Sequence, residues 1–222
     1  MPPLEAFVPS LAIGLVLFVM LWFALGTQRN IRRGNDIMRW LQGGLPLIGP
    51  RTTLRWLGSS AAELTIAEAH PPFRDATVVI VLEPRDIPLL WAFARSRGLR
   101  DFLIVRANLR RSPRFVVDAG DPGAWTGPGD VVGADPEIRS VDWVDGAVAR
   151  ASPGADTSAA RAAWERLAEV SDAVWRVTVQ PVVPHLEVHL RPPDPRLVSA
   201  DRVLTPIRDL GETLAREERT RT

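Results

Sequence analysis

Residues 6–28, AFVPSLAIGLVLFVMLWFALGTQ, contain no charged side chain. As a helix, this run would extend about 34 Å at ~1.5 Å per residue, which is enough to cross a hydrocarbon core of about 30 Å. Buried core helices rarely continue so far without a polar face. The stretch therefore predicts a single transmembrane helix near the N-terminus, in contact with the lipid bilayer, and a folded domain after it.

The same stretch has a second interpretation, a cleaved signal peptide. Ala24-Leu25-Gly26 is compatible with a cleavage site. A signal peptide, however, begins with a positively charged segment, and the residues before this run contain Glu5 and no basic side chain. We therefore predict a retained, single-pass signal anchor.

The flanks of the apolar run predict its orientation. Four arginines follow it closely, whereas no basic residue precedes it; they are Arg29, Arg32, Arg33 and Arg39. Basic flanks of membrane spans stay on the cytoplasmic side. The expected location is the cell membrane, with the N-terminus outside and the C-terminal domain in the cytoplasm.

Composition narrows the classes of function. All 27 basic residues are arginine, as is typical of bacterial proteins from GC-rich genomes, and the formal net charge is +1. This balance argues against a general nucleic-acid binder. The absence of cysteine excludes disulfides, thiolate metal sites and cysteine nucleophiles.

The pattern divides the chain into an anchor at residues 1–28, a juxtamembrane amphipathic segment or linker at 29–50, and an α+β domain at 51–222. Within the second segment, residues 30–42 form an amphipathic helical pattern. Its apolar side consists of Ile31, Ile37, Met38 and Leu41. Two interpretations are open: a helix lying in the headgroup region with Trp40 at the interface, or the first core helix of the domain.

Alternating or β-branched runs predict the strands of the domain, at 52–57, 63–68, 76–82, 101–109, 114–118, 141–148, 174–180 and 185–190. Helical spacing predicts helices at 87–97, 157–170 and 202–218. In the first of these helices, Leu90, Phe93 and Ala94 are expected on the buried side. The short turn between 101–109 and 114–118 predicts a hairpin.

Two topologies fit this order of elements. From Thr77 the order is βαββαβ, which is that of a ferredoxin-like sandwich with extra strands. Alternatively, a ββα unit at 63–97 is duplicated at 174–218. Either topology predicts an α+β fold in which an antiparallel or mixed sheet carries helices on one face.

The best metal-binding pattern is His185-Leu-Glu-Val-His189. On a strand, the two histidines and Glu187 share one face, but the outer pair lies about 14 Å apart, too far to share one ion. The chain also lacks a Gly-rich phosphate loop, a Gly-x-Ser-x-Gly elbow and a His-Glu-x-x-His motif. We therefore predict neither a catalytic residue nor a metal or other cofactor, and a hydrolase or metal enzyme is disfavoured.

Charge is distributed in two adjacent blocks: residues 84–114 carry a net +6 and residues 115–145 a net −6. The blocks either neutralise each other or leave an arginine face for anionic lipid or an acidic partner. Nucleic acid is disfavoured because the block lacks an array of stacking aromatic residues. The residues predicted to make interactions are Arg32, Arg33, Arg39, Trp40, Arg110, Arg111 and Arg114.

Together these features predict a membrane-anchored, non-enzymatic α+β domain that binds a protein partner or organises a membrane complex. The alternative is a membrane-tethered domain that binds a small ligand or has a regulatory role. Its pocket is expected near Trp125, in the loop rich in Gly, Pro and Asp.

Overall fold

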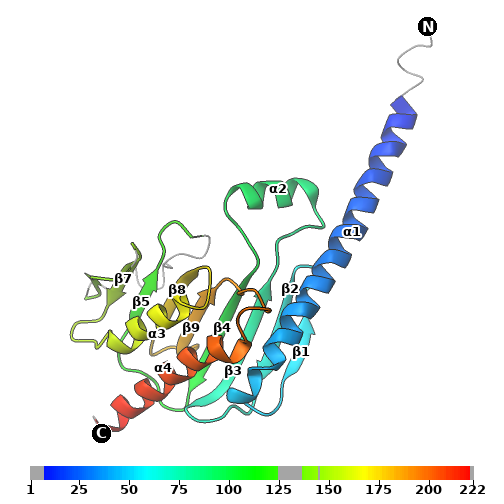
Figure 1. The fold of residues 1–222 in the computed structure, drawn as a ribbon. Helices are drawn as coiled ribbons and strands as arrows, with labels where there is room; N and C mark the ends of the chain where they lie inside the picture. Colours follow the sequence, from blue (N-terminus) through cyan, green and yellow to red (C-terminus); the bar gives the residue numbers. More distant parts are fainter. Residues whose placement is uncertain (1–7, 125–136, 145, 221–222) are drawn as a thin grey trace.

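The computed structural model describes residues 8–124, 137–144 and 146–220. It is an α+β protein in which one long N-terminal helix leads into an antiparallel sheet that carries further helices (Figure 1). Trp125, near which the ligand pocket of the alternative function was expected, lies outside these residues.

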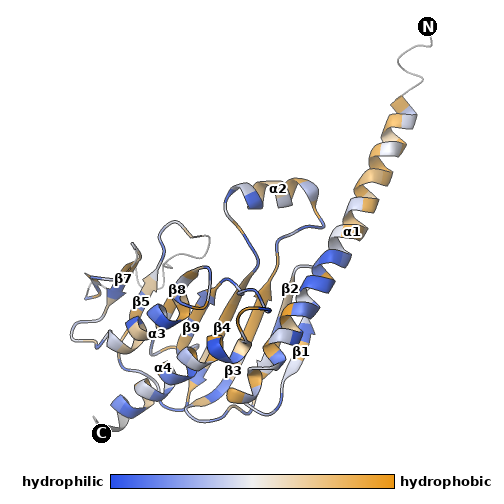
Figure 2. Cartoon of the chain, viewed as in Figure 1, coloured by the Kyte–Doolittle hydropathy of each residue, from blue (hydrophilic) through white to orange (hydrophobic). Residues whose placement is uncertain are grey.

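Helix α1 runs without interruption from Val8 to Gln42. Its N-terminal half extends away from the domain and is almost entirely apolar (Figure 2). Among the described residues, it is the one helix whose length and composition would allow it to cross a membrane. The helix does not end at the first charges, because nothing breaks it before the turn at Gly43-Gly44.

The C-terminal half of α1 belongs to the domain. Ile37, Met38 and Leu41 are buried in the main core, while Ile31 is exposed. A short 3₁₀ helix, η2 (Leu45–Leu47), follows and adds Leu45 to the same core. Of the two interpretations of residues 30–42, the structure matches the core helix, and the core therefore begins before residue 51.

Nine strands in the described residues form one sheet, in the spatial order β1-β2-β3-β4-β9-β8-β5-β7-β6, and every neighbouring pair is antiparallel. Their bounds are β1 Thr53–Trp56, β2 Ala61–Ile66, β3 Phe73–Val81, β4 Phe102–Leu109, β5 Val117–Gly120, β6 Arg139–Val141, β7 Val148–Ala151, β8 Val174–Val179 and β9 Leu186–Leu190.

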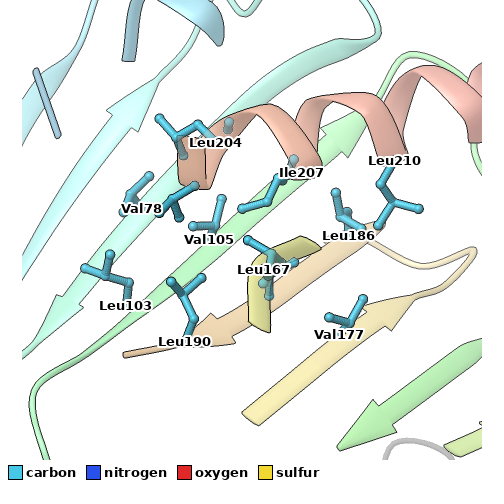
Figure 3. Close-up of a cluster of buried hydrophobic side chains, with 14 of the residues drawn as sticks. Val78, Leu103, Val105, Leu167, Val177, Leu186, Leu190, Leu204, Ile207 and Leu210 are labelled. Atoms are coloured by element: carbon cyan, nitrogen blue, oxygen red, sulfur yellow. The ribbon is translucent and has the colours of Figure 1, made fainter. Parts of the chain in front are cut away.

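Helices α3 (Ser158–Ala168) and α4 (Ala200–Thr220) pack on one face of this sheet, where α1 also contributes to the core. Leu204 and Ile207 of α4 lie over Val78, Val105 and neighbouring strand residues (Figure 3). Alternate strand residues point to this face, so a shift of one residue in register would expose the whole apolar set.

Helix α2 (Pro88–Ser96) is placed differently. It lies beyond the ends of β3 and β4, beside α1 (Figure 1). Only Ala94 of its expected buried side is buried; Leu90 and Phe93 are exposed, so that prediction was wrong. The reason is that α2 does not cover the sheet but contacts α1 and a small second cluster around Phe102 and Trp175.

The topology corrects two further predictions. β4 pairs with β3 and β9, whereas β5 pairs with β7 and β8, so the predicted hairpin between residues 101–109 and 114–118 is wrong. The ferredoxin-like order is also wrong, because β3 and β4 are antiparallel neighbours with α2 in their connection. No mixed pairing occurs among the described strands.

The duplicated ββα interpretation is correct only in its strands. β2 with β3 and β8 with β9 are both antiparallel neighbours. Their following helices are not equivalent, since α4 packs on the sheet and α2 lies beside α1. The predicted strand at 141–148 is in fact two strands, with β6 ending at Val141 and β7 beginning at Val148.

Candidate functional site at the junction of helix and domain

The middle of α1 docks closely on the segment that connects β3 to α2. Gly26, Asn30 and Gly34 recur at intervals of four residues, which places them on one side of the helix, and all three are buried. A Cβ atom added to Gly26 would lie 2.3 Å from the carbonyl oxygen of Arg85. One added to Gly34 would lie 2.5 Å from the indole of Trp56. Glycine is therefore needed for α1 to approach the domain at both levels.

Hydrogen bonds fix the helix at this place. The Trp22 indole N–H donates to the Arg85 carbonyl oxygen at 2.9 Å. The Asn30 side-chain amide donates to the Glu83 carbonyl oxygen at 3.0 Å and accepts a bond of 3.0 Å from the Arg85 guanidinium. Asn30 is fully buried, so its loss would leave buried polar groups without partners.

A network of ion pairs extends the junction. Arg85 contacts Asp101 at 2.9 Å and Glu83 at 3.4 Å. Arg33 reaches Asp101 at 3.2 Å, and Arg95 reaches Glu83 at 3.2 Å. Both carboxylates are buried, and each is thus shared between two arginines from different segments.

The carboxylate of Asp101 is held in its charged form. Burial by itself would raise the pKa of Asp101, but hydrogen bonds from Arg85, from the Glu83 backbone N–H and from Arg33, together with the charge of Arg85, lower it below its usual value. The negative charge therefore persists at neutral pH, which keeps Arg33 of α1 bound to the domain.

Beside this network lies an open groove of about 860 Å³, which we call the junction groove. Its lining residues are mostly charged. They come from α1, from the connection after β3, from the residues just before β4 and β8, and from the proline-rich segment after β9: Arg33, Asp36, Arg39, Trp40, Glu83, Arg100, Asp101, Asp172, Arg191, Pro192, Pro193, Asp194, Pro195 and Arg196. The lining contains both acidic and basic side chains next to prolines. It is therefore better suited to binding the polar surface of a protein than to binding a small anion.

The structure places the predicted interaction residues in two regions. Arg33, Arg39 and Trp40 line the junction groove, and Arg32 is exposed on the same helix. Trp40 is not free to lie at a membrane interface by itself, because its indole N–H donates to the Val198 carbonyl oxygen at 2.8 Å.

The other predicted residues lie at the far end of β4. Arg110 donates to the carbonyl oxygens of Phe73 and Ala69, and Arg111 is exposed next to it, on the same surface as the end of α4. Arg114 follows in the same connection. The arginines of residues 84–114 therefore do not form one face. Arg106 lies within β4, and the others lie before or after this strand: Arg85, Arg95, Arg97, Arg100, Arg110, Arg111 and Arg114.

The described residues show ion pairs for part of this block. Arg85 and Arg95 pair with Glu83 and Asp101, which belong to or precede the block itself. In the acidic segment, the buried Asp118 pairs with Arg176 at 2.8 Å, not with the preceding arginines.

The histidine pattern is engaged in structural contacts. The Nδ1 atom of His185 accepts the Leu109 backbone N–H at 3.0 Å, and His189 Nε2 lies 2.7 Å from Glu187. Glu187 also binds Arg106 at 2.7 Å. Across the parts of the chain that the structure describes, no three histidine or acidic side chains are placed to share a metal ion.

Sequence reasoning missed the residues that build the junction. Gly26, Asn30 and Gly34 carried a signal, the four-residue spacing of small residues across the end of the apolar run. Glu83 and Asp101 carried none, because their partners are distant in sequence and only the fold brings them together.

No protein-family model matches this chain, and no curated protein is similar enough in sequence to indicate a relationship. The function has to be argued from the junction and its groove.

Proposed function

We propose that this chain is a single-pass membrane protein whose α+β domain binds a protein partner in the junction groove and so organises a complex at the cytoplasmic face of the membrane. α1 is the anchor in this proposal, with its N-terminus outside. The role is binding and not catalysis.

The observation that carries the proposal is the continuity of α1. Its first half exposes apolar side chains, and its second half is part of the domain core. No flexible linker separates the two, so the domain keeps a fixed position and angle relative to the anchor helix. A rigid connection between anchor and domain would give the domain a defined orientation relative to a partner that is itself in the membrane.

The groove supports a protein partner because of its position and charge. It begins beside α1, where a partner at the membrane surface would meet it. Arg39 and Arg196 are exposed, and neither forms an ion pair with a buried carboxylate. Arginine is one of the residues enriched at protein–protein interfaces.

Cross-linking and affinity purification of the full-length protein in mild detergent, followed by mass spectrometry, test this function. We expect a partner in stoichiometric amount with the parent. Arg39→Glu with Arg196→Glu should reduce its recovery at least tenfold, whereas the matched Arg111→Glu variant, at the far end of the sheet, should not.

Equal loss with both variants would argue against the groove as the binding site. A monomer that retains a small molecule in native mass spectrometry, with no protein partner, would favour the alternative, a ligand-binding or regulatory domain. Recovery of the parent in the soluble fraction without detergent would contradict the anchor itself.

A further inference from the structure

Helix α2 turns its most hydrophobic side chains to the outside. Leu89 is 85% exposed, Phe93 52% and Leu90 46%, and Ile87 just before the helix is also exposed. The spacing of residues 89, 90 and 93 places them on one side of the helix. A contiguous apolar surface of this kind is uncommon on a domain that is surrounded only by water.

The inner side of α2 is held firmly, so this exposure is a fixed feature of the fold. The Trp91 indole N–H donates to the buried Glu83 carboxylate at 2.7 Å, and Arg95 reaches the same carboxylate at 3.2 Å. Ala94 is buried in the second cluster. With Trp91 and Ala94 facing inward, the apolar side of α2 must face outward.

The height of α2 along α1 shows what it faces. The rings of Trp22 and Trp91 are 6.1 Å apart, so α2 lies level with residue 22 of the anchor. The uncharged run from Ala6 to Leu21 has 16 residues, which as a helix at ~1.5 Å per residue would be about 24 Å long, less than a bilayer core of about 30 Å. A bilayer around α1 would therefore extend past Trp22, to the level of α2.

We propose that α2 is a second membrane-contacting element, which lies in the interface with Leu89, Leu90 and Phe93 among the lipid chains. The proposal rests on the anchoring of α1 proposed above. Figure 2 shows that α2, which is largely hydrophobic, lies at the side of the domain from which the apolar half of α1 projects.

The arginines around α2 fit the same assignment. The guanidinium of Arg97 lies 5.0 Å from the centre of the Phe93 ring, and that of Arg95 lies 5.7 Å from the Trp91 ring. Arginine beside an aromatic ring at an interface keeps its apolar stem in the lipid and its charge among the headgroups. Anionic headgroups are the expected contact of this end of the arginine-rich block.

A second contact changes what the anchor can do. A single helix can tilt and roll within the bilayer, whereas two contacts that are separated laterally restrict both motions. The junction groove would then always face the same direction relative to the membrane surface. The contact at α2 thus adds to the proposed function, because it orients the junction groove for its partner.

The chain has no cysteine, so single substitutions permit clean labelling of the full-length protein in liposomes. The variants are Leu89→Cys and Phe93→Cys on α2, Val16→Cys in the exposed part of α1, and Val182→Cys as a control. Val182 is an exposed apolar residue in the β8–β9 connection, at the opposite end of the sheet from α2. Each carries an environment-sensitive fluorophore, and nitroxide-bearing lipids serve as the quencher.

We expect strong quenching and a blue-shifted emission at residues 89 and 93, several times the effect at residue 182. Quenching at residue 16 without quenching at 89 and 93 would overturn the assignment of α2 and leave the anchor intact. Absence of quenching at all four positions would overturn both. A spin label at residue 89 that shows spin–spin broadening without lipid contact would mean that a second copy covers α2, which also overturns the proposal.

Discussion

Replacement of Gly26 by alanine tests the junction directly. The new Cβ atom would lie 2.3 Å from the Arg85 carbonyl oxygen and 2.6 Å from the Asp86 Cα atom. Both are backbone atoms, which cannot rotate away, so α1 and the connecting segment have to separate by roughly 1 Å to restore ordinary contact. Gly14→Ala is the matched control, because its Cβ would meet nothing within 4 Å.

The magnitude follows from the contacts that this separation affects. Overpacking costs typically about 1–3 kcal/mol. The bonds from Trp22 and Asn30 to the connecting segment, at 2.9 and 3.0 Å, would lengthen, and each contributes about 1 kcal/mol. Alanine in a helix regains about 1 kcal/mol over glycine. The net destabilisation is about 2–4 kcal/mol, or roughly 5–15 °C in Tm for a chain of this size.

Thermal unfolding of the full-length protein in mild detergent, followed by near-ultraviolet circular dichroism, measures this effect. Undocking of α1 also withdraws Ile37 and Leu41 from the core, so the transition of the whole domain should move. Gly14→Ala should leave Tm unchanged or slightly raised. If the two variants have the same Tm within error, α1 is not docked as the structure places it. The proposed rigid connection between the anchor and the domain would then be wrong.

Two further predictions concern orientation and acid sensitivity. A fluorescent protein fused after Thr222 should fluoresce, and a phosphatase fused there should stay inactive, because the arginines after the apolar run keep the domain in the cytoplasm. The preference for this orientation should weaken when glutamine replaces the exposed residues Arg29, Arg32 and Arg39. Arg33 is left unchanged because it pairs with Asp101. An active phosphatase on the parent would reverse the orientation. In the sheet, burial raises the pKa of Glu187, but His189 and Arg106 lower it to about 2. Its stabilising effect is therefore complete above the ordinary value of 4.5 and is lost as the pH falls toward about 2. Glu187→Gln should lower Tm near neutral pH, and the difference from the parent should vanish near pH 2; a difference that does not vary with pH would contradict this role.

Local sequence predicted the elements well where the pattern is strong. The β-branched run at 76–82 matches β3 as far as Val81, the alternating run at 185–190 contains β9, and the apolar stripe at 202–218 lies in α4. These features depend on the spacing of apolar side chains within one element, which the sequence shows directly. The long apolar helix was predictable for the same reason.

Strand pairing was not predictable in this way. β4 pairs with β9, about eighty residues away in the chain, and β5 pairs with β8, although 110–113 looked like a hairpin turn. The apolar faces of the strands are compatible with several neighbours, and β5 and β8 are buried on both faces. The choice depends on which arrangement buries all the apolar faces together under α1, α3 and α4, which is a property of the whole fold.

From the sequence alone follow the long apolar helix near the N-terminus, the absence of any chemistry that needs cysteine, and the presence of an α+β domain. Only the folded structure shows that the apolar helix and the first core helix are one continuous helix, and that the apolar side chains of α2 are exposed beside Trp22. It also decided that Glu83 and Asp101 join Arg33, Arg85 and Arg95 in one buried network. The physical reason is that helical and strand periodicity is local, whereas burial and charge pairing depend on segments that only the folded chain brings together.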